Sequence, residues 1–327
     1  MTILVTGGAG YIGSHAVRLL RERGRDVVVL DTMEFGHRAA VGDVPLVEAD
    51  IADQEAVADV VRHYGVTAVM HFAGYKAAGE SMERPGRYFQ NNISKSAAFL
   101  ETLRHAGVGR LVFSSSCAVY GTPDGVPVAE DAPIRPESPY GESKATVERL
   151  LSWYDQCHGL RSVSLRYFNV AGAWPDGSIG EDWSVTLNLV PLVMKAAARR
   201  SGPLRVFGTD YPTPDGTAMR DYVHVVDLAE AHLRALELLE SGATTTVVNL
   251  GTGVGSSVLE VLNAAERMMG HAVPYELAPR RAGDPVALYS DNLRSRDLLG
   301  WKPEFGLDAI VASAWAWHSN HLDGYGD

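Results

Sequence analysis

The feature that most constrains this chain is a run of glycines joining an apolar segment to an amphipathic one. Residues 3–6 (ILVT) read as a buried strand and lead directly into residues 7–13 (GGAGYIG). The next residues, 14–24 (SHAVRLLRERG), have the spacing of a helix. Glycine at a strand-to-helix turn permits a tight bend and close packing of helix on strand. The chain is therefore expected to open with a βα unit.

The same alternation continues through the first half of the chain. Short apolar, β-branched runs occur at 27–30 (VVVL), 68–72 (AVMHF), 111–115 (LVFSS) and 162–168 (SVSLRYF), with helix-like stretches between them. Such a pattern predicts a parallel sheet with helical crossovers. We expect an α/β fold, a doubly wound parallel (Rossmann) sheet, with a smaller α/β substrate-binding domain.

The domain boundary is expected near residue 169, where the sequence loosens into AGAWPDGSIGEDW, which is rich in glycine and acidic residues. The first domain would cover 1–168 and the second 169–327. The segment 221–239 (DYVHVVDLAEAHLRALELL) and the VVNLGTG run after it resemble one more helix and strand. Part of 221–253 is therefore expected to return to the first sheet.

Composition excludes several classes of protein. The 327 residues carry 40 acidic and 29 basic side chains, a net charge of −11, which argues against nucleic acid as a partner. The two cysteines, Cys117 and Cys157, form neither a CxxC pair nor a Cys/His ligand pattern, so we expect no disulfide framework and no metal site. The start of the chain does not resemble a signal peptide, and the apolar runs are too short to cross a membrane. A cytoplasmic protein is expected.

The glycine turn predicts a dinucleotide site. Both GxGxxG (Gly8, Gly10, Gly13) and GxxGxxG (Gly7, Gly10, Gly13) are present, and the helix N-terminus after them attracts phosphates. Asp31 directly follows the second strand, where a carboxylate accepts hydrogen bonds from an adenosine ribose and repels a 2′-phosphate. NAD is therefore favoured over NADP.

Two alternatives to this site are weaker. An ordinary glycine turn followed by a surface aspartate would not require strand, turn, helix, strand and acid in this order. A phosphate-binding P-loop would open its helix with Gly-Lys-Ser/Thr, whereas this helix opens with Gly13-Ser14-His15.

A candidate catalytic pair lies in residues 139–144 (PYGESK). Tyr140 and Lys144 are four residues apart, which places them on one face of a helix. A free tyrosine, with a pKa of about 10, is a poor base at neutral pH. A nearby ammonium and a positive nicotinamide ring favour the phenolate, so we expect Lys144 to lower the pKa of Tyr140. Ser116, at the end of another strand, is expected to hydrogen-bond the reacting oxygen. The alternative is a surface YxxxK pair and an ordinary strand end.

Several segments together resemble the UDP-galactose 4-epimerase family of the extended short-chain dehydrogenases. The resemblance runs from Met1 nearly to the C-terminus, and the segments around Phe72 and Phe207 are its most specific parts. These segments are GGAGYIGSH (7–15), MHFAGYKAAGES (70–81), SSSCAVYG (114–121), SPYGESK (138–144), LRYFNVAGA (165–173), VFGTDYPTPDGTAMRDYVHV (206–225) and APRRAGDP (278–285).

The resemblance implies a tightly bound NAD that is reduced and reoxidised within each turnover. In that family the tyrosine matching Tyr140 takes the proton from the sugar 4-hydroxyl while hydride leaves C4 for the nicotinamide. The 4-ketose then rotates within the site and takes the hydride back on its other face, so that the configuration at C4 inverts. Lys144 matches the lysine that acts on the tyrosine, and Ser116 matches the Ser/Thr near the reacting oxygen. A homodimer is also implied, because the family commonly pairs through helices of the sheet domain.

The same resemblance supplies the binding residues. With Asp50 and Ile51 near the adenine and Lys76 near the phosphates, the expected NAD contacts are Gly7, Gly10, Tyr11, Ile12, Gly13, Asp31, Asp50, Ile51, Phe72, Ala73, Gly74, Lys76, Asn91, Tyr140, Lys144 and Phe168. The expected UDP-hexose contacts are Ser116, Asn169, Asn188, Leu189, Arg205, Phe207, Arg220, Arg281 and Asp284. Guanidinium groups suit phosphates, and a carboxylate suits a ribose hydroxyl pair.

Leu288 concerns substrate range. It stands where some members of the family have a bulky tyrosine beside the sugar 2-substituent and others have a smaller residue. A smaller wall would admit an N-acetyl group, so UDP-N-acetylhexosamines are possible additional substrates.

Three other functions remain as alternatives. A 4,6-dehydratase of the same fold would have Thr-Asp-Glu where this chain has Ser116-Cys117-Ala118. A plain NAD-linked alcohol or sterol dehydrogenase would share the first half but not the segments APRRAGDP and DGTAMRDY. A non-catalytic dinucleotide sensor often lacks the tyrosine or the lysine, and both are present here.

Overall fold

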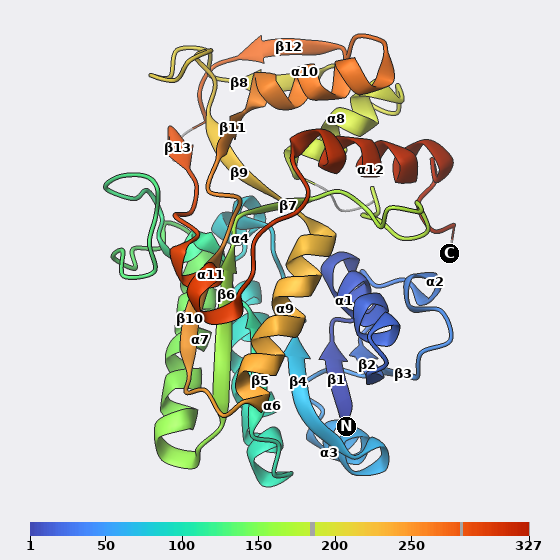
Figure 1. The fold of residues 1–327 in the computed structure, drawn as a ribbon, viewed down its shortest axis with the longest axis vertical. Helices are drawn as coiled ribbons and strands as arrows, with labels where there is room; N and C mark the ends of the chain where they lie inside the picture. The colour runs from blue at the N-terminus through green and yellow to red at the C-terminus, as the bar shows by residue number, and fades with distance from the viewer. Residues whose placement is uncertain (184–186, 282–283, 327) are drawn as a thin grey trace.

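The apolar strands expected from the sequence form one parallel sheet in the lower part of Figure 1. The computed structural model describes residues 1–183, 187–281 and 284–326. In space the strands follow the order β10-β6-β5-β4-β1-β2-β3. Their bounds are β1 (Thr2–Thr6), β2 (Asp26–Asp31), β3 (Leu46–Glu48), β4 (Val66–His71), β5 (Arg110–Ser114), β6 (Arg161–Tyr167) and β10 (Thr246–Leu250). The expected doubly wound α/β fold is confirmed.

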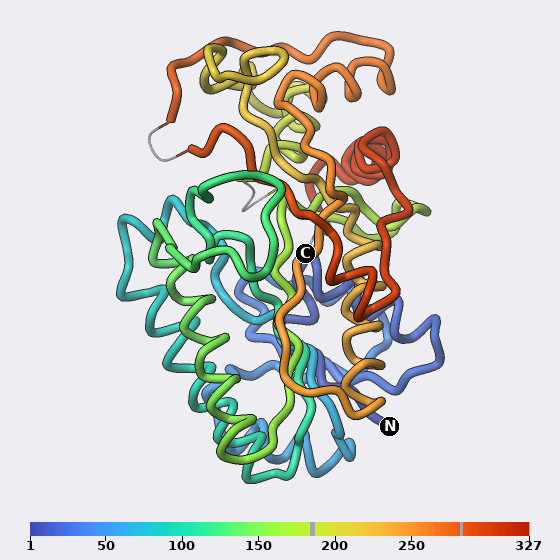
Figure 2. The backbone as a smooth tube through the Cα atoms, turned by 60° about the vertical axis from the view of Figure 1, so that its left-hand side comes forward, coloured from blue at the N-terminus to red at the C-terminus, as the bar shows by residue number. Residues whose placement is uncertain are grey.

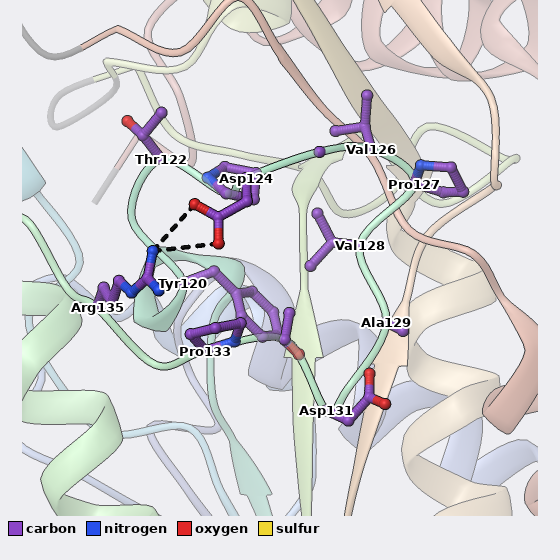
Figure 3. A pocket seen from close by; sticks show the side chains of 13 residues that line it. Tyr120, Thr122, Asp124, Val126, Pro127, Val128, Ala129, Asp131, Pro133 and Arg135 are labelled. Atoms are coloured by element: carbon purple, nitrogen blue, oxygen red, sulfur yellow. Dashed lines mark hydrogen bonds and ion pairs between the residues drawn. The ribbon is translucent and has the colours of Figure 1, made fainter.

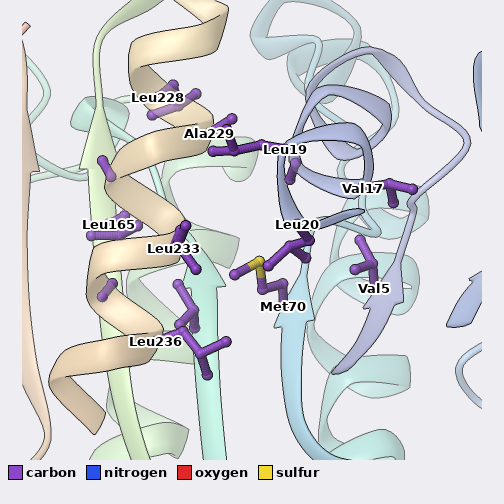
Figure 4. Packing of buried hydrophobic residues seen from close by; sticks show 14 of the residues in the cluster. Val5, Val17, Leu19, Leu20, Met70, Leu165, Leu228, Ala229, Leu233 and Leu236 are labelled. Atoms are coloured by element: carbon purple, nitrogen blue, oxygen red, sulfur yellow. The ribbon is translucent and has the colours of Figure 1, made fainter. Parts of the chain in front are cut away.

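Helices cover both faces of this sheet because both faces of each central strand are apolar. Along β1, Ile3 and Val5 pack on one side of the sheet and Leu4 on the other, as the two-residue period of a strand requires. Figure 4 shows the first side, where leucines of two helices meet across the strands. That side is covered by α1 (Tyr11–Glu22) and α9 (Val225–Glu240), and the other by α3 (Gln54–Tyr64), α6 (Lys95–His105) and α7 (Pro139–His158).

The order of the strands reverses between β1 and β4. From β1 the chain winds through β2 to β3 at one edge, and from β4 it winds through β5 and β6 toward the other. At such a switch point the loops beyond the strand ends diverge and leave a crevice for a ligand. The glycine turn follows β1, and residues 72–76 follow β4, so two predicted cofactor segments meet there.

A second unit forms the upper part of Figure 1. Its core is a separate apolar cluster that includes Val193, Tyr222, Val261 and Ile310. Its strands are β7 (Asn169–Ala171), β9 (Met219–His224), β11 (Gly255–Ser257) and β13 (Ala287–Leu288) around β9, with β8 (Leu204–Phe207) and β12 (Tyr275–Ala278) as a separate parallel pair. Its helices are α8 (Leu189–Ala197), α10 (Val258–Met269) and α12 (Leu307–Asn320).

The chain passes between the two units more than once. After β9 it returns along α9, which packs on α1, and then enters β10, which pairs with β6 at the edge of the large sheet. Residues 221–224, which the sequence analysis grouped with the helix, form the end of β9 instead. Tyr222 and Val223 are buried by pairing with β7, so tertiary packing determines their strand conformation.

The remaining elements are short. They are α2 (Arg38–Val41), α4 (Ala78–Glu83), α5 (Pro85–Tyr88), the π-helix η1 (Phe89–Ser94), the 3-10 helix η2 (Cys117–Val119) and α11 (Leu293–Leu299). Within the described residues, none of the helices has both the length and the apolar composition needed to cross a membrane.

Candidate active site

The glycine turn is shaped by contacts that exclude side chains. Gly7 has a φ of +67°, and a Cβ there would lie 2.6 Å from the amide nitrogen of Ala73. A Cβ on Gly13 would lie 2.2 Å from the carbonyl oxygen of Gly7. Glycine is therefore required at both positions, because the turn touches itself and the loop after β4. A Cβ on Gly10, by contrast, would meet only one described atom within 4 Å, at 3.4 Å.

Asp31 lies at the end of β2 and turns back toward the glycine turn. Its carboxylate accepts hydrogen bonds from the backbone N–H groups of Ala9 and Met33, both at 3.0 Å. Burial raises the pKa of this carboxyl, and the backbone donors partly oppose that rise. The backbone therefore fixes the position of the carboxylate beside the turn.

Asp50 and Ile51 follow β3, farther along the same edge of the sheet. The Asp50 carboxylate accepts the Ala52 N–H at 2.9 Å and pairs with Lys95 of α6. Ile51 is buried in the core beneath. Because Asp31 pairs with Glu48 at the end of β3, Asp50 and Ile51 follow at the same carboxyl edge of the sheet as Asp31.

These features fit a dinucleotide. The first turn of α1 has neither an acidic side chain nor a side-chain cap in the described structure, so its N–H groups are available to a phosphate. Glycines at positions 7 and 13 let the backbone come close to such a group, and Asp31 supplies acceptors for a ribose. The residues present therefore match the chemistry of NAD.

The predicted catalytic pair lies at the start of α7. Ser138 caps the helix by accepting the Gly141 N–H, and Pro139 occupies its first position. Lys144 is buried, and its Nζ donates to the carbonyl oxygen of Ser114 at 2.7 Å, at the end of β5. The spacing argument therefore places both side chains where expected, at the carboxyl ends of the strands.

Burial dominates the electrostatics of this pair in the protein alone. Burial lowers the pKa of Lys144 to about 8, although Glu148 opposes the change. Burial raises the pKa of Tyr140 well above its usual value, and a hydrogen bond with Ser116 only partly offsets this. The expected lowering of the Tyr140 pKa depends on Lys144 together with a bound nicotinamide ring, so it stays a prediction for the protein with NAD.

Ser116 lies two residues beyond β5 and caps the 3-10 helix η2. Its Oγ accepts the Ala118 N–H at 3.2 Å, and Ser116 is near enough to the Tyr140 phenol to oppose the rise of its pKa. The strand-end argument therefore brings Ser116 and Tyr140 together.

Three positioning residues were not found from the sequence. Asn92, in the π-helix η1, donates to the Oγ of Ser143 at 3.0 Å, and Ser143 donates to the Tyr140 carbonyl at 2.7 Å. The Tyr140 N–H donates to Ser81 at 3.2 Å. These bonds fix the first turn of α7. Asn91, which the resemblance implies as an NAD contact, donates its side-chain amide to Asn92 at 3.2 Å, and its contact with NAD stays a prediction.

A buried ion pair supports the other side of α7. The carboxylate of Glu148, one turn beyond Lys144, binds Arg166 of β6 in a bidentate arrangement with distances of 2.6 Å and 2.9 Å. Both side chains are buried. Arg166 also donates to the Tyr120 hydroxyl at 2.8 Å, so α7 is tied to the loop after β5.

The other predicted cofactor residues make contacts with several different elements. A Cβ on Gly74 would lie 3.8 Å from the Lys144 Nζ, so the loop after β4 contacts the catalytic helix. Phe72 packs on His232 of α9 with ring centroids 4.6 Å apart. Lys76 pairs with Glu181 of the second unit, and Phe168 is buried in one cluster with Leu288.

The predicted substrate residues form a cationic group in the second unit. The Asp284 carboxylate binds both Arg220 and Arg281, and Arg281 and Arg205 each lie 5.0 Å from the Phe207 ring. Burial raises the pKa of Cys117 to about 12, and the positive charge of Arg220 opposes this rise. Arg220 is therefore near the loop that follows β5.

Other predicted substrate residues are farther apart. Asn169 is the first residue of β7, two residues after the end of β6, and it pairs with Tyr222 of β9. Asn188 and Leu189 lie at the start of α8, and within the described residues no hydrogen bond ties them to the strand ends. Within the cationic group, Arg205 is more than half exposed, and its Nε lies 3.7 Å from the Glu276 carboxylate.

A pocket shown in Figure 3 lies in the loop after η2, and two of its lining residues, Tyr120 and Val128, pack in one cluster with Phe168. It is enclosed by residues 120–135, where Arg135 binds Asp124 at 3.0 Å. Its described lining includes none of the predicted site residues, so the pocket belongs to the shape of this loop and not to the candidate site.

A glycine turn, a buried carboxylate beside it and a Tyr/Lys pair at the switch point fit a dinucleotide-dependent enzyme. A family model for the "NAD dependent epimerase/dehydratase family" matches residues 3–251, and the chain belongs to that family.

Relatives and solved structures agree with this assignment. The UDP-glucose 4-epimerase of Lacticaseibacillus casei is 47% identical over 329 residues, covering 100% of this chain and 99% of the relative. The structure of the Brucella ovis UDP-glucose 4-epimerase in complex with NAD is 42% identical, with a TM-score of 0.95 over 98% of both chains. That of the UDP-Glc/GlcNAc 4-epimerase from Campylobacter jejuni is 37% identical, with a TM-score of 0.86 over 98% of this chain and 99% of that one. The resemblance to UDP-galactose 4-epimerases is confirmed.

The buried pair under α7 yields a stability prediction. Replacing Glu148 by Gln leaves the Arg166 guanidinium buried without its counter-charge, which costs about 3–5 kcal/mol. The matched control is Glu142→Gln on the same helix, which breaks an exposed pair with Arg149 and costs about 0–1 kcal/mol. Urea unfolding of both variants measures the difference. Equal, small losses would show that the pair does not support the helix.

Proposed function

We propose that this chain catalyses the reversible C4 epimerisation of UDP-galactose and UDP-glucose through a transient 4-keto sugar, with NAD retained and recycled in each turnover. The observation that carries the proposal is the position of Tyr140, Lys144 and Ser116 together at the strand ends beside the glycine turn. Names of relatives that match this chain over its full length support the same reaction.

Tyr140 is the proposed acid–base group. In this proposal its phenolate oxygen takes the proton of the sugar 4-hydroxyl and later gives it back, while Ser116 hydrogen-bonds the same oxygen. NAD, when bound, supplies the positive nicotinamide ring and the acceptor for the hydride that leaves C4 and returns to its other face. Because burial favours the neutral phenol in the protein alone, the charges of Lys144 and of the bound nicotinamide ring would be needed to favour the phenolate that accepts this proton.

Binding of the two ligands is proposed to follow the two units. Residues 1–168, with part of 221–253, hold NAD through the glycine turn, Asp31 and the loops after β3 and β4. Residues 169–327 hold the UDP-sugar. There, Arg220 and Arg281 would bind the diphosphate. Asp284, which forms ion pairs with both of them, would accept hydrogen bonds from the ribose hydroxyl groups.

The proposal includes N-acetylated substrates. Leu288 is buried against Phe168, at the border between the two units. A leucine is smaller there than the tyrosine of some relatives, and the Campylobacter jejuni neighbour is named for both UDP-Glc and GlcNAc. Conversion of UDP-N-acetylglucosamine is therefore part of the proposed activity.

A homodimer and a cytoplasmic location complete the proposal. Trp153, on the outer face of α7, is 62% exposed, which favours burial of this helix against a second copy. Cys157 on the same helix is a free, exposed thiol, which suits a reducing compartment.

The reaction is tested by adding UDP-galactose to the purified protein without free NAD. We expect UDP-glucose to form, and we expect Tyr140→Phe to lower kcat by about 10²–10⁴ while bound NAD is kept, because only the proton transfer is lost. The matched control is Tyr64→Phe, at the end of α3 just before the amino end of β4, opposite the carboxyl ends of the strands. This variant should keep full activity. A protein that holds NAD and converts no UDP-galactose, or releases a 4-keto-6-deoxy sugar instead, would overturn the assignment.

The substrate range is tested at Leu288. In Leu288→Tyr, the added ring crowds the sugar 2-substituent, so kcat/KM for UDP-N-acetylglucosamine should fall by about tenfold or more relative to that for UDP-galactose. Leu293→Tyr, at an exposed position in the same segment, should leave the ratio unchanged. A wild-type protein that does not convert UDP-N-acetylglucosamine would contradict the proposal.

A further inference from the structure

We propose that Glu181 is a positioning residue that holds Lys76 in the cofactor site and thereby slows the release of NAD. The inference rests on the proposed function, since it concerns the cofactor of that reaction. It assigns a role to an ion pair between the two units of the molecule.

Glu181 is a buried carboxylate in the loop between β7 and α8. Its side chain is 6% exposed, and its Oε1 lies 2.9 Å from the Nζ of Lys76, whose own side chain is 52% exposed. A carboxylate removed from water is costly unless it is paired and hydrogen-bonded. Lys76 provides that charge, so burial of Glu181 holds the flexible lysine in one place.

The pair lies beside the start of α1, where phosphates are expected. Lys76 is in the loop after β4, and its Nζ lies 5.9 Å from the ring centroid of Tyr11. The charge of Glu181 reaches the same ring, because it adds to the effect of burial in raising the pKa of Tyr11. An unpaired carboxylate at this distance would repel a phosphate. With Lys76 beside it, the local charge is balanced, and the ammonium is held near Tyr11, the first residue of α1.

The loop that carries Glu181 is firmly anchored to the second unit. The Glu181 carbonyl accepts a hydrogen bond from the Trp317 indole at 3.0 Å, and Gly180 exchanges hydrogen bonds with the Tyr325 hydroxyl at 3.0 Å and 3.1 Å. A Cβ on Gly180 would lie 2.3 Å from the Trp317 ring, so helix and loop are in direct contact. In Figure 1 this loop lies beneath α12 and above α1.

The same loop also touches the first unit at other points. The Tyr11 hydroxyl donates to the Gly172 carbonyl at 2.6 Å, Arg18 of α1 binds Asp176 at 2.6 Å, and His37 lies 3.8 Å from Asp182. The Lys76–Glu181 pair differs from the Arg18–Asp176 pair, because it joins the loop to a side chain that is expected to reach the cofactor phosphates. Breaking it should therefore free NAD, whereas breaking the Arg18–Asp176 pair should not.

The experiment compares Glu181→Gln with Asp176→Asn in the full-length protein loaded with NAD. Release is measured as exchange of bound NAD for isotopically labelled NAD, at low and high salt. We expect release to be roughly tenfold faster in Glu181→Gln, with less NAD bound after desalting, and within about twofold of wild type in Asp176→Asn. Lys76→Met should also release NAD faster, and the double variant no faster than Lys76→Met alone.

A structural role of Glu181 is separated by the thermal midpoint and by Glu181→Asp, which keeps the charge and should restore slow release. Unchanged release in Glu181→Gln, or equal acceleration in Asp176→Asn, would overturn the inference while leaving the reaction in place. A wild-type protein that holds no NAD would instead overturn the proposed function.

Discussion

The contact between the Lys144 ammonium and the Ser114 carbonyl is the interaction on which the rest of the site depends. It joins the catalytic helix α7 to the end of a central strand, where the loops after β1, β4 and β5 converge. A buried ammonium must be hydrogen-bonded, so the helix has little freedom to move away from the sheet. Tyr140, one turn earlier, is thereby fixed beside Ser116.

The site also relies on charges that are balanced over short distances. Glu148 and Arg166 neutralise each other beneath α7, and Glu148 moderates the fall in the pKa of Lys144. In the second unit, Asp284 separates Arg220 from Arg281. Figure 2 shows how closely the two units approach. The large sheet and the second unit each contribute a charged side chain at this border, where Lys76 and Glu181 form an ion pair.

The local parts of this arrangement could be predicted from the sequence. The glycine turn and the Tyr140/Lys144 pair depend on spacing within one turn or one helix, and the strand pattern was sufficient for the doubly wound sheet. The Lys76–Glu181 and Glu148–Arg166 pairs join distant segments, so no periodicity reveals them. Asn92 was missed because its hydrogen bond to Ser143 joins segments that are 51 residues apart, and the rise in the Tyr140 pKa of the protein alone could not be predicted because desolvation depends on packing.

The central claim is that NAD acts as a hydride store inside the site, and UDP-galactose labelled with deuterium at C4 tests it most directly. After conversion without added NAD, mass spectrometry of the product should find the deuterium retained at C4 of UDP-glucose. Replacement of the label by hydrogen from water, at full conversion, would contradict the account, because the hydride would then have left the site.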